Sequence, residues 1–233
     1  MGLSIAVFVP EGIVIASDGL AEIRNLSDDQ SFLHKKQRRL FIFQNRFLVN
    51  IHGGGYAKGM PYAFYIEDVF SKLESTQFST ITDFATAFNF EMKSFLDDKQ
   101  KLSFYVMGLE EDDKLHTPTP ILLLWDNDHP SIINRSIDNK IVYNYHSVGH
   151  GLWLNKLLLP TSFEMGNGEK ICFENVDIDF TKYSLEDAFD FSKDLFAISR
   201  TMDKIVQLKQ MIGDYISYGI MTRDGRFTIV KDY

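Results

Sequence analysis

The chain of 233 residues has a single cysteine and no long apolar run. Cys172 has no second cysteine to pair with, so an internal disulfide is excluded, and its flanks Ile171 and Phe173 indicate a strand that holds an inert, half-buried thiol. No apolar stretch approaches the roughly 18 residues that a membrane span needs, and the first residues carry no basic segment typical of a secretory signal. We therefore expect no membrane partner and a cytoplasmic location.

Basic residues are also fewer than acidic ones. The sequence has 24 Lys and Arg against 32 Asp and Glu, which gives a formal net charge of -8 at pH 7. This balance argues against nucleic acid or an anionic membrane surface as the main partner. The basic run at 34–39 is local, and we interpret it as a solvated face.

Aromatic residues, by contrast, are abundant. They make up 14% of the chain, with 20 Phe, and hydrophobic residues make up 45%, which is a globular composition rather than a disordered one. The length fits one large domain. Because no internal repeat, low-complexity tract or linker interrupts the sequence, we expect residues 1–233 to form a single domain.

The first part of the chain predicts strands. Apolar runs at 5–9 and 13–16 flank Pro10-Glu11-Gly12, the pattern of a β-hairpin, and runs at 40–43 and 47–51 repeat it. Neither of the first two runs alternates between apolar and polar residues, so their sheet needs cover on both faces and forms an inner layer. We assign these four strands to one sheet.

Helices follow in a pair. Apolar residues recur at helical spacing from Tyr56 to about Ser75, with Pro61 in the first turn. A stronger helix begins after Thr80, which has Asp83 three residues later as a capping partner. Both helices are expected to lie over the first sheet.

The rest of the chain repeats this order. Further strands at 102–107, 121–125, 131–134 and 140–147 supply the second sheet. A short helix is expected at 152–159 and a hairpin segment at 170–176. A long helix that Ser184 and Asp187 cap runs to about 206, and two closing strands follow at 215–221 and 227–230. The two sheets must be buried on both faces, and the helices follow one another in pairs along the chain. This order predicts an α+β fold, a four-layer αββα sandwich of two mainly antiparallel sheets.

Several motifs resemble those of one family. Segment 8–19, which ends in Asp18-Gly19, resembles the opening hairpin of 20S proteasome β-type subunits and of HslV. Segments 37–41, 52–55, 147–151 and 221–225 are similar to that family's third strand, glycine turn, Gly-Ser-Gly loop and closing hairpin, in the same order. The resemblance implies the fold of the N-terminal-nucleophile hydrolases.

The resemblance also implies a chemistry. In the family a threonine freed at the chain start attacks the substrate, and its α-amine, with a pKa of about 8, accepts the hydroxyl proton. Counting back from Asp18 puts that position on Gly2, which has no hydroxyl or thiol. The position of the family's lysine falls on Arg39, whose guanidinium stays protonated and is poorly suited to assist proton transfer. The position of its loop serine falls on His150.

Three site positions keep the family's residue types. They are Asp18, Asp203 on the late helix, and Gly53, whose N–H would stabilise an oxyanion. We expect Asp18 and Arg39 to lie close enough for a salt bridge. For each residue a plain structural role, such as capping a turn, stays open beside the functional one.

These substitutions leave three hypotheses. The first is a non-catalytic proteasome-like subunit that acts by assembly or by binding a peptide or small molecule. The second is an active peptidase or amidase that uses Ser4 after removal of the first three residues, although Ser4 is two residues too close to Asp18. The third is an enzyme that uses Cys172, for which no paired base is evident.

No cofactor or metal is expected. His146 and His150 lack the helix that would make them a metal pair, because glycines flank His150. Gly53-Gly54-Gly55 lacks the Gly-Lys-Ser/Thr ending of a phosphate loop, and segment 126–129 has the composition of an ordinary turn. As a partner we expect a second copy of the chain, because a monomer would have difficulty hiding the many aromatic residues of its helices.

Overall fold

The computed structural model describes most of the chain, in ranges separated by gaps. These ranges are 2–24, 31–34, 36–52, 56–58, 60–96, 102–111, 118–126, 128–136, 138, 140–149, 154, 161–164, 170–173, 178–206 and 212–231.

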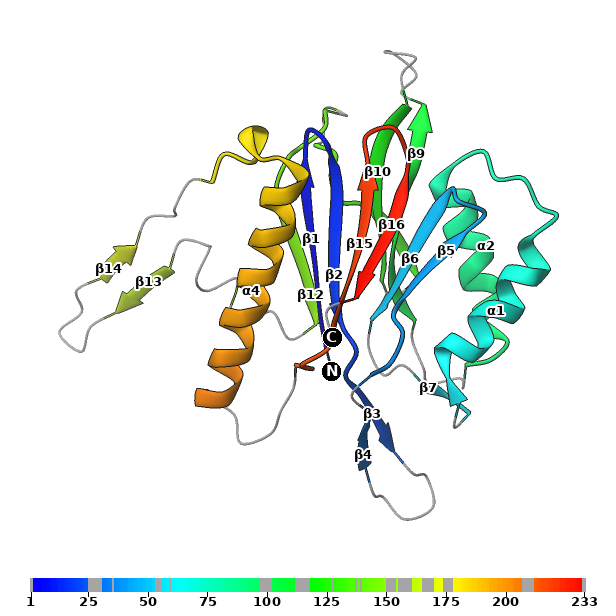
Figure 1. The fold of residues 1–233 in the computed structure, drawn as a ribbon, viewed down its shortest axis with the longest axis horizontal. Helices are drawn as coiled ribbons and strands as arrows, with labels where there is room; N and C mark the ends of the chain where they lie inside the picture. The colour runs from blue at the N-terminus through cyan, green and yellow to red at the C-terminus, as the bar shows by residue number, and fades with distance from the viewer. Residues whose placement is uncertain are drawn as a thin grey trace.

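Two five-stranded antiparallel sheets form the centre of the fold (Figure 1). The first sheet has the order β12-β1-β2-β15-β16, with strands Tyr145–Gly149, Leu3–Val9, Gly12–Asp18, Ile216–Thr222 and Phe227–Lys231. The second sheet has the order β11-β10-β9-β6-β5, with strands His129–Ile132, Pro118–Asp126, Ser103–Glu111, Phe47–His52 and Leu40–Phe43.

Helices cover the outer faces of both sheets. α1 (Tyr62–Leu73) and α2 (Ile81–Lys93) lie on the second sheet, and α4 (Leu185–Val206) lies on the first (Figure 1). The short helix η1 spans Phe180–Lys182. Three two-stranded hairpins complete the described elements, namely β3–β4 (Ala21–Arg24 and Ser31–His34), β7–β8 (Tyr56–Ala57 and Met60–Pro61) and β13–β14 (Thr161–Glu164 and Lys170–Phe173).

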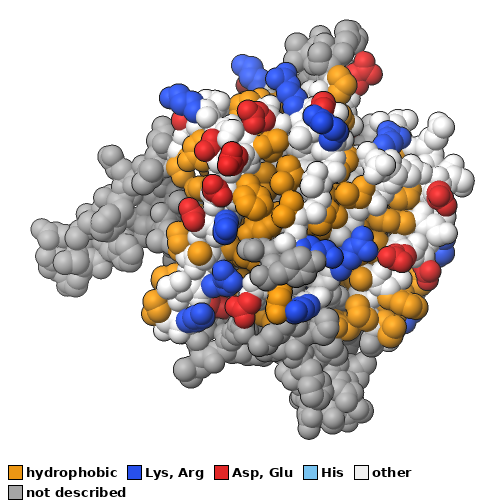
Figure 2. All heavy atoms as spheres, in the orientation of Figure 1, with side chains coloured by type: hydrophobic (Ala, Val, Ile, Leu, Met, Phe, Trp, Pro, Cys, Tyr) orange, Lys and Arg blue, Asp and Glu red, His pale blue; other side chains and the backbone are white. Residues whose placement is uncertain are grey.

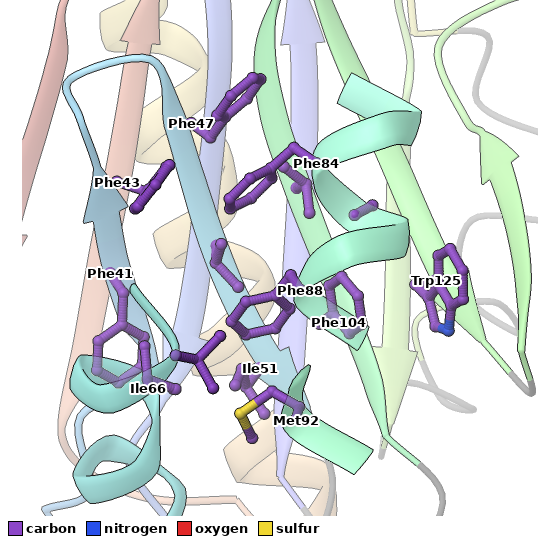
Figure 3. Close-up of a cluster of buried hydrophobic side chains, with 14 of the residues drawn as sticks. Phe41, Phe43, Phe47, Ile51, Ile66, Phe84, Phe88, Met92, Phe104 and Trp125 are labelled. Carbon is purple, nitrogen blue, oxygen red and sulfur yellow. The ribbon is translucent and has the colours of Figure 1, made fainter. Parts of the chain in front are cut away.

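The layers are joined by three apolar cores. One lies between α1, α2 and the second sheet, where Phe47 and Phe84 stack with ring centroids 4.4 Å apart (Figure 3). Another lies between α4 and the first sheet, and the third between the two sheets. The predicted four-layer αββα sandwich is therefore confirmed.

Strand β1 shows why its sequence does not alternate. Ile5 and Val7 point into the core under α4, while Ala6 and Phe8 point into the core between the sheets. Both sets are buried because the sheet is covered on both faces. Even-numbered residues of β1, such as Ala6, therefore face the second sheet, together with the residues that pair with them on the neighbouring strands.

The two predicted helix caps are present. The Thr80 hydroxyl accepts the Asp83 N–H at 3.0 Å and the Asp83 carboxylate accepts the Thr80 N–H at 3.1 Å, which forms a capping box. The Ser184 hydroxyl accepts the Asp187 N–H at 3.1 Å at the start of α4.

Three predictions of elements were wrong. The first four predicted strands do not form one sheet, because β5 and β6 pair with β9 in the second sheet and β12 joins β1 in the first. The first helix begins at Tyr62 rather than Tyr56, and Pro61 precedes it as a capping residue. The strand predicted at 140–147 is shorter and later, at Tyr145–Gly149.

The hairpin β3–β4 was not predicted from sequence. Its strands are four residues each and mix polar with apolar residues, so they lack a clear strand signal. The short helix predicted at 152–159 lies outside the described residues, except Leu154. The hairpin segment predicted at 170–176 corresponds to β14 and its partner β13.

Candidate functional site

Asp18 ends strand β2 and is the centre of the candidate site. Its side chain is buried, and its carboxylate accepts two backbone hydrogen bonds, from Leu3 N–H at 3.1 Å and from Gly213 N–H at 2.6 Å. Leu3 begins β1 and Gly213 lies just before β15. One carboxylate thus joins three separate segments at the same end of the first sheet.

Burial destabilises the ionised form of the Asp18 carboxyl. Loss of hydration raises the pKa of this carboxyl from 3.8 to about 6, although the Gly213 N–H, the Arg39 guanidinium and the Leu3 N–H act in the opposite direction. The carboxyl is therefore ionised at neutral pH and protonates in mild acid.

Arg39 lies immediately before β5 and is 3% exposed. Its guanidinium donates to the Leu20 carbonyl at 2.6 Å and to the Ile51 carbonyl at 3.5 Å. Burial lowers its pKa, and the charge of Asp18 raises it. The two side chains act on each other electrostatically within one site, and a direct ion pair between them stays a prediction.

Gly2 occupies the position that the sequence assigned to the nucleophile. Its φ is 106°, in the region that favours glycine. A Cβ atom built on Gly2 would lie 2.8 Å from Asp18 Oδ1 and 3.5 Å from the Leu20 carbonyl oxygen, so a side chain requires neighbouring atoms to move. Gly2 therefore lies next to Asp18.

Ser4 lies inside the first sheet. It pairs with Ser17 of β2 on one side and Val148 of β12 on the other, and it is 3% exposed. Its Oγ lies 2.9 Å from Ser17 Oγ and 3.1 Å from Nδ1 of His52, which ends β6 of the second sheet. The hydroxyl is therefore held between the two sheets.

A buried polar cluster extends from Ser4 between the sheets. The His52 ring meets the Tyr105 ring edge-on at a centroid distance of 4.5 Å, and the Tyr105 hydroxyl lies 2.5 Å from Nδ1 of His146. Burial, with the positive charges of Arg39 and His146, lowers the pKa of His52 well below its ordinary value. His52 is thus neutral at physiological pH.

This cluster was missed by the sequence reasoning, which placed His52 in a glycine turn. The signal that finds it is strand parity: Ser4 shares the parity of Ala6, and His52 shares that of Leu48, which both face the other sheet. Polar residues at such positions must find partners in the core.

The remaining predicted residues separate into two groups. Asp203 of α4 is buried, and its Oδ2 accepts the Ile212 N–H at 3.2 Å, next to the residue that binds Asp18. Its carboxylate therefore holds the segment that reaches Asp18. Gly53 and His150 lie outside the described residues.

The described residues contain no group of three His, Cys, Asp or Glu side chains arranged to hold a metal ion. Among the described helices none is long and apolar enough to cross a membrane.

Comparison with known proteins concerns the fold. No protein-family model matches the chain, and no curated protein matches it by sequence. A solved structure of an Anbu mutant from Hyphomicrobium sp. strain MC1, a proteasome-like protein, superposes with a TM-score of 0.59 over 100% of this chain and 86% of that one. The chain has the proteasome-like fold. Sequence identity in this superposition is 12%, so the proteasome-like likeness is one of architecture.

Proposed function

We propose that this chain is a proteasome-like subunit that lacks N-terminal-nucleophile peptidase activity and acts through self-assembly. The observation that carries the proposal is the position of Gly2, beside Asp18 and without a side chain. Acyl transfer of this type needs a hydroxyl or thiol at that position. Removal of Met1 would free an amine on Gly2 but would supply no hydroxyl or thiol.

The partners of Asp18 and Arg39 support a structural role for both residues. Each side chain is buried, and each binds backbone groups of neighbouring segments. A guanidinium at the lysine position stays protonated, so it cannot exchange a proton with a reacting group. Such contacts are typical of residues that stabilise the fold rather than of residues that transfer protons.

Exposed apolar side chains support self-assembly. Phe64 of α1 is 58% exposed, Phe90 of α2 is 73% exposed and Ile205 of α4 is 71% exposed. They lie on the helices that cover the two outer faces of the sandwich (Figure 1). Burial of such side chains against another copy would remove apolar surface from water.

The Ser4–His52 contact favours a second candidate, an amidase that uses Ser4. An imidazole 3.1 Å from a serine hydroxyl is the arrangement of a nucleophile and its base. Three features oppose this candidate: Ser4 is 3% exposed, its strand is paired on both sides, and Leu3, which would have to be removed, binds Asp18.

Peptide turnover separates the two candidates. The proposal expects the purified chain and a Ser4→Ala variant to show the same background rate on a mixture of fluorogenic peptides. A rate that is well above the blank and disappears in Ser4→Ala would favour the amidase. Ser17→Ala is the matched control, because Ser17 contacts the same hydroxyl from the next strand.

A further inference from the structure

A pocket of about 400 Å³ lies at the edge of the sandwich where β16 of the first sheet approaches β5 of the second. Its apolar lining includes Leu40 and Ile229, which belong to the core between the sheets, and Tyr215 just before β15. The pocket therefore opens from solvent onto the core between the sheets.

The charged groups of this pocket are all positive. Lys36, Arg38 and Lys231 line it, and the described lining residues include no Asp or Glu. This is unusual in a chain with a formal net charge of -8. Figure 2 shows basic and apolar side chains next to each other near the middle of this face.

Two of the cations are held in place by aromatic rings. Lys36 Nζ lies 4.1 Å from the centroid of the Tyr215 ring, and the Arg38 guanidinium lies 4.6 Å from that of Phe41. Arg38 Nε also donates to the Leu40 carbonyl at 3.1 Å. Cations that are already oriented lose less side-chain entropy when an anion binds.

The backbone between these cations is also fixed. Gln37, which separates Lys36 from Arg38, is buried, and its N–H donates to the Gly19 carbonyl at 2.8 Å. Gly19 in turn donates its N–H to the Tyr215 carbonyl at 2.9 Å. The wall of the pocket is thus made of segments tied together by hydrogen bonds.

Among the residues that the structure describes, the acidic side chain paired with these cations is Glu67, a weak competitor. Glu67 Oε1 lies 3.5 Å from Arg38 Nη1, with half or more of each side chain exposed. Exposed pairs of this kind contribute little free energy. A ligand anion can therefore replace Glu67 at small cost.

We propose that this pocket binds a small organic carboxylate with an apolar body, such as an aryl- or alkyl-carboxylic acid. The carboxylate would face Lys36, Arg38 and Lys231, and the guanidinium fork of Arg38 matches its two oxygens. The apolar body would lie on Leu40 and Ile229. This site requires no nucleophile, so it is independent of the proposed loss of peptidase activity.

Isothermal titration calorimetry on the full chain tests the proposal with phenylacetate, neutral phenylacetamide and inorganic phosphate. We expect phenylacetate to bind, with an affinity that falls as salt rises, and the other two probes to bind at least about tenfold more weakly. Phenylacetamide lacks the charge, and phosphate lacks the apolar body. Equal binding of all three probes, or no binding of phenylacetate at millimolar concentration, would overturn the proposal.

Variants locate the binding. Lys36→Gln with Lys231→Gln is expected to weaken phenylacetate binding about tenfold, whereas Lys140→Gln, an exposed lysine outside the pocket, leaves it unchanged. Ser217→Phe fills the pocket from β15 and is expected to abolish binding. Undiminished binding in both pocket variants, with melting curves that show folded protein, would refute the assignment.

Discussion

The carboxylate of Asp18 accepts the backbone N–H of Gly213 at 2.6 Å, although 195 positions separate the two residues in the chain. The same carboxylate also accepts the N–H of Leu3. Asp18 thus connects the first strand of the chain with the segment that leads into β15. These two contacts show that Asp18 supports the packing of the candidate site.

Replacing Asp18 with alanine should destabilise the protein. The substitution leaves the Leu3 and Gly213 N–H groups buried without their acceptor. We expect the free energy of unfolding at pH 5 to fall by about 2–4 kcal/mol, measured by urea denaturation. Asp68→Ala on the exposed face of α1 is the control and should change it by less than about 0.5 kcal/mol. An equal effect of both substitutions would contradict the anchoring role.

The stability that depends on Asp18 should decrease as pH rises. The pKa of its carboxyl is about 6 in the folded state, compared with 3.8 as the ordinary value. Between these pH values the folded state holds a proton that the unfolded state has lost, so this contribution is complete below about pH 3.8 and is lost as pH rises through about 6. The shift corresponds to about 3 kcal/mol.

The comparison that isolates this effect is with Asp18→Asn, which cannot titrate at that position. Urea denaturation of both proteins at several pH values between about 4 and 7 should show the parent losing stability relative to the variant as pH increases. A difference that is constant or changes in the other direction would show that Asp18 is not buried as described.

The imidazole of His52 should stay neutral in mild acid. Its burial and the nearby charges of Arg39 and His146 lower its pKa well below 6.5. Long-range ¹H–¹⁵N correlation spectra should therefore show no protonation of this ring as pH falls from about 7.5 to about 5.5. The His52→Asn variant assigns the signal, and a normal titration would indicate that water reaches the space between the sheets.

The sequence predicted features of the fold that depend on local chemistry. The capping boxes at Thr80 and Ser184 and the turn at Pro10-Glu11-Gly12 involve residues within a few positions of each other, so composition and spacing are sufficient to find them. The assignment of β5 and β6 to a sheet depends instead on which distant strand they meet. Apolar runs do not indicate the partner strand, because every strand that is buried on both faces has a similar apolar sequence.

The candidate site shows the same division. Asp18, Gly2 and Arg39 were proposed as site residues from their order in the chain, because the motifs around them resemble a known family. The contacts of Asp18 with Gly213 and of Ser4 with His52 join residues 195 and 48 positions apart. Strand parity indicates that Ser4 and His52 face the space between the sheets, but which residues meet depends on how the two sheets and a late helix pack together.

Self-association should be detectable at micromolar concentration. Sedimentation velocity is expected to show species larger than the 26.9 kDa chain, because Phe64 and Phe90 leave large apolar areas on the helical layer exposed. Phe64→Glu with Phe90→Glu should shift the protein toward the monomer, whereas Lys140→Glu should not. A monomer in all three proteins would contradict assembly through this face.

The most direct test of the central claim is intact-protein mass spectrometry after treatment with an epoxyketone and, separately, a β-lactone. Both probes form adducts with a hydroxyl or thiol at the N-terminal-nucleophile site, and Gly2 has neither group. The account predicts that the mass is unchanged by either probe. A stoichiometric adduct on Ser4, with the first three residues missing, would contradict it and identify the chain as an active hydrolase.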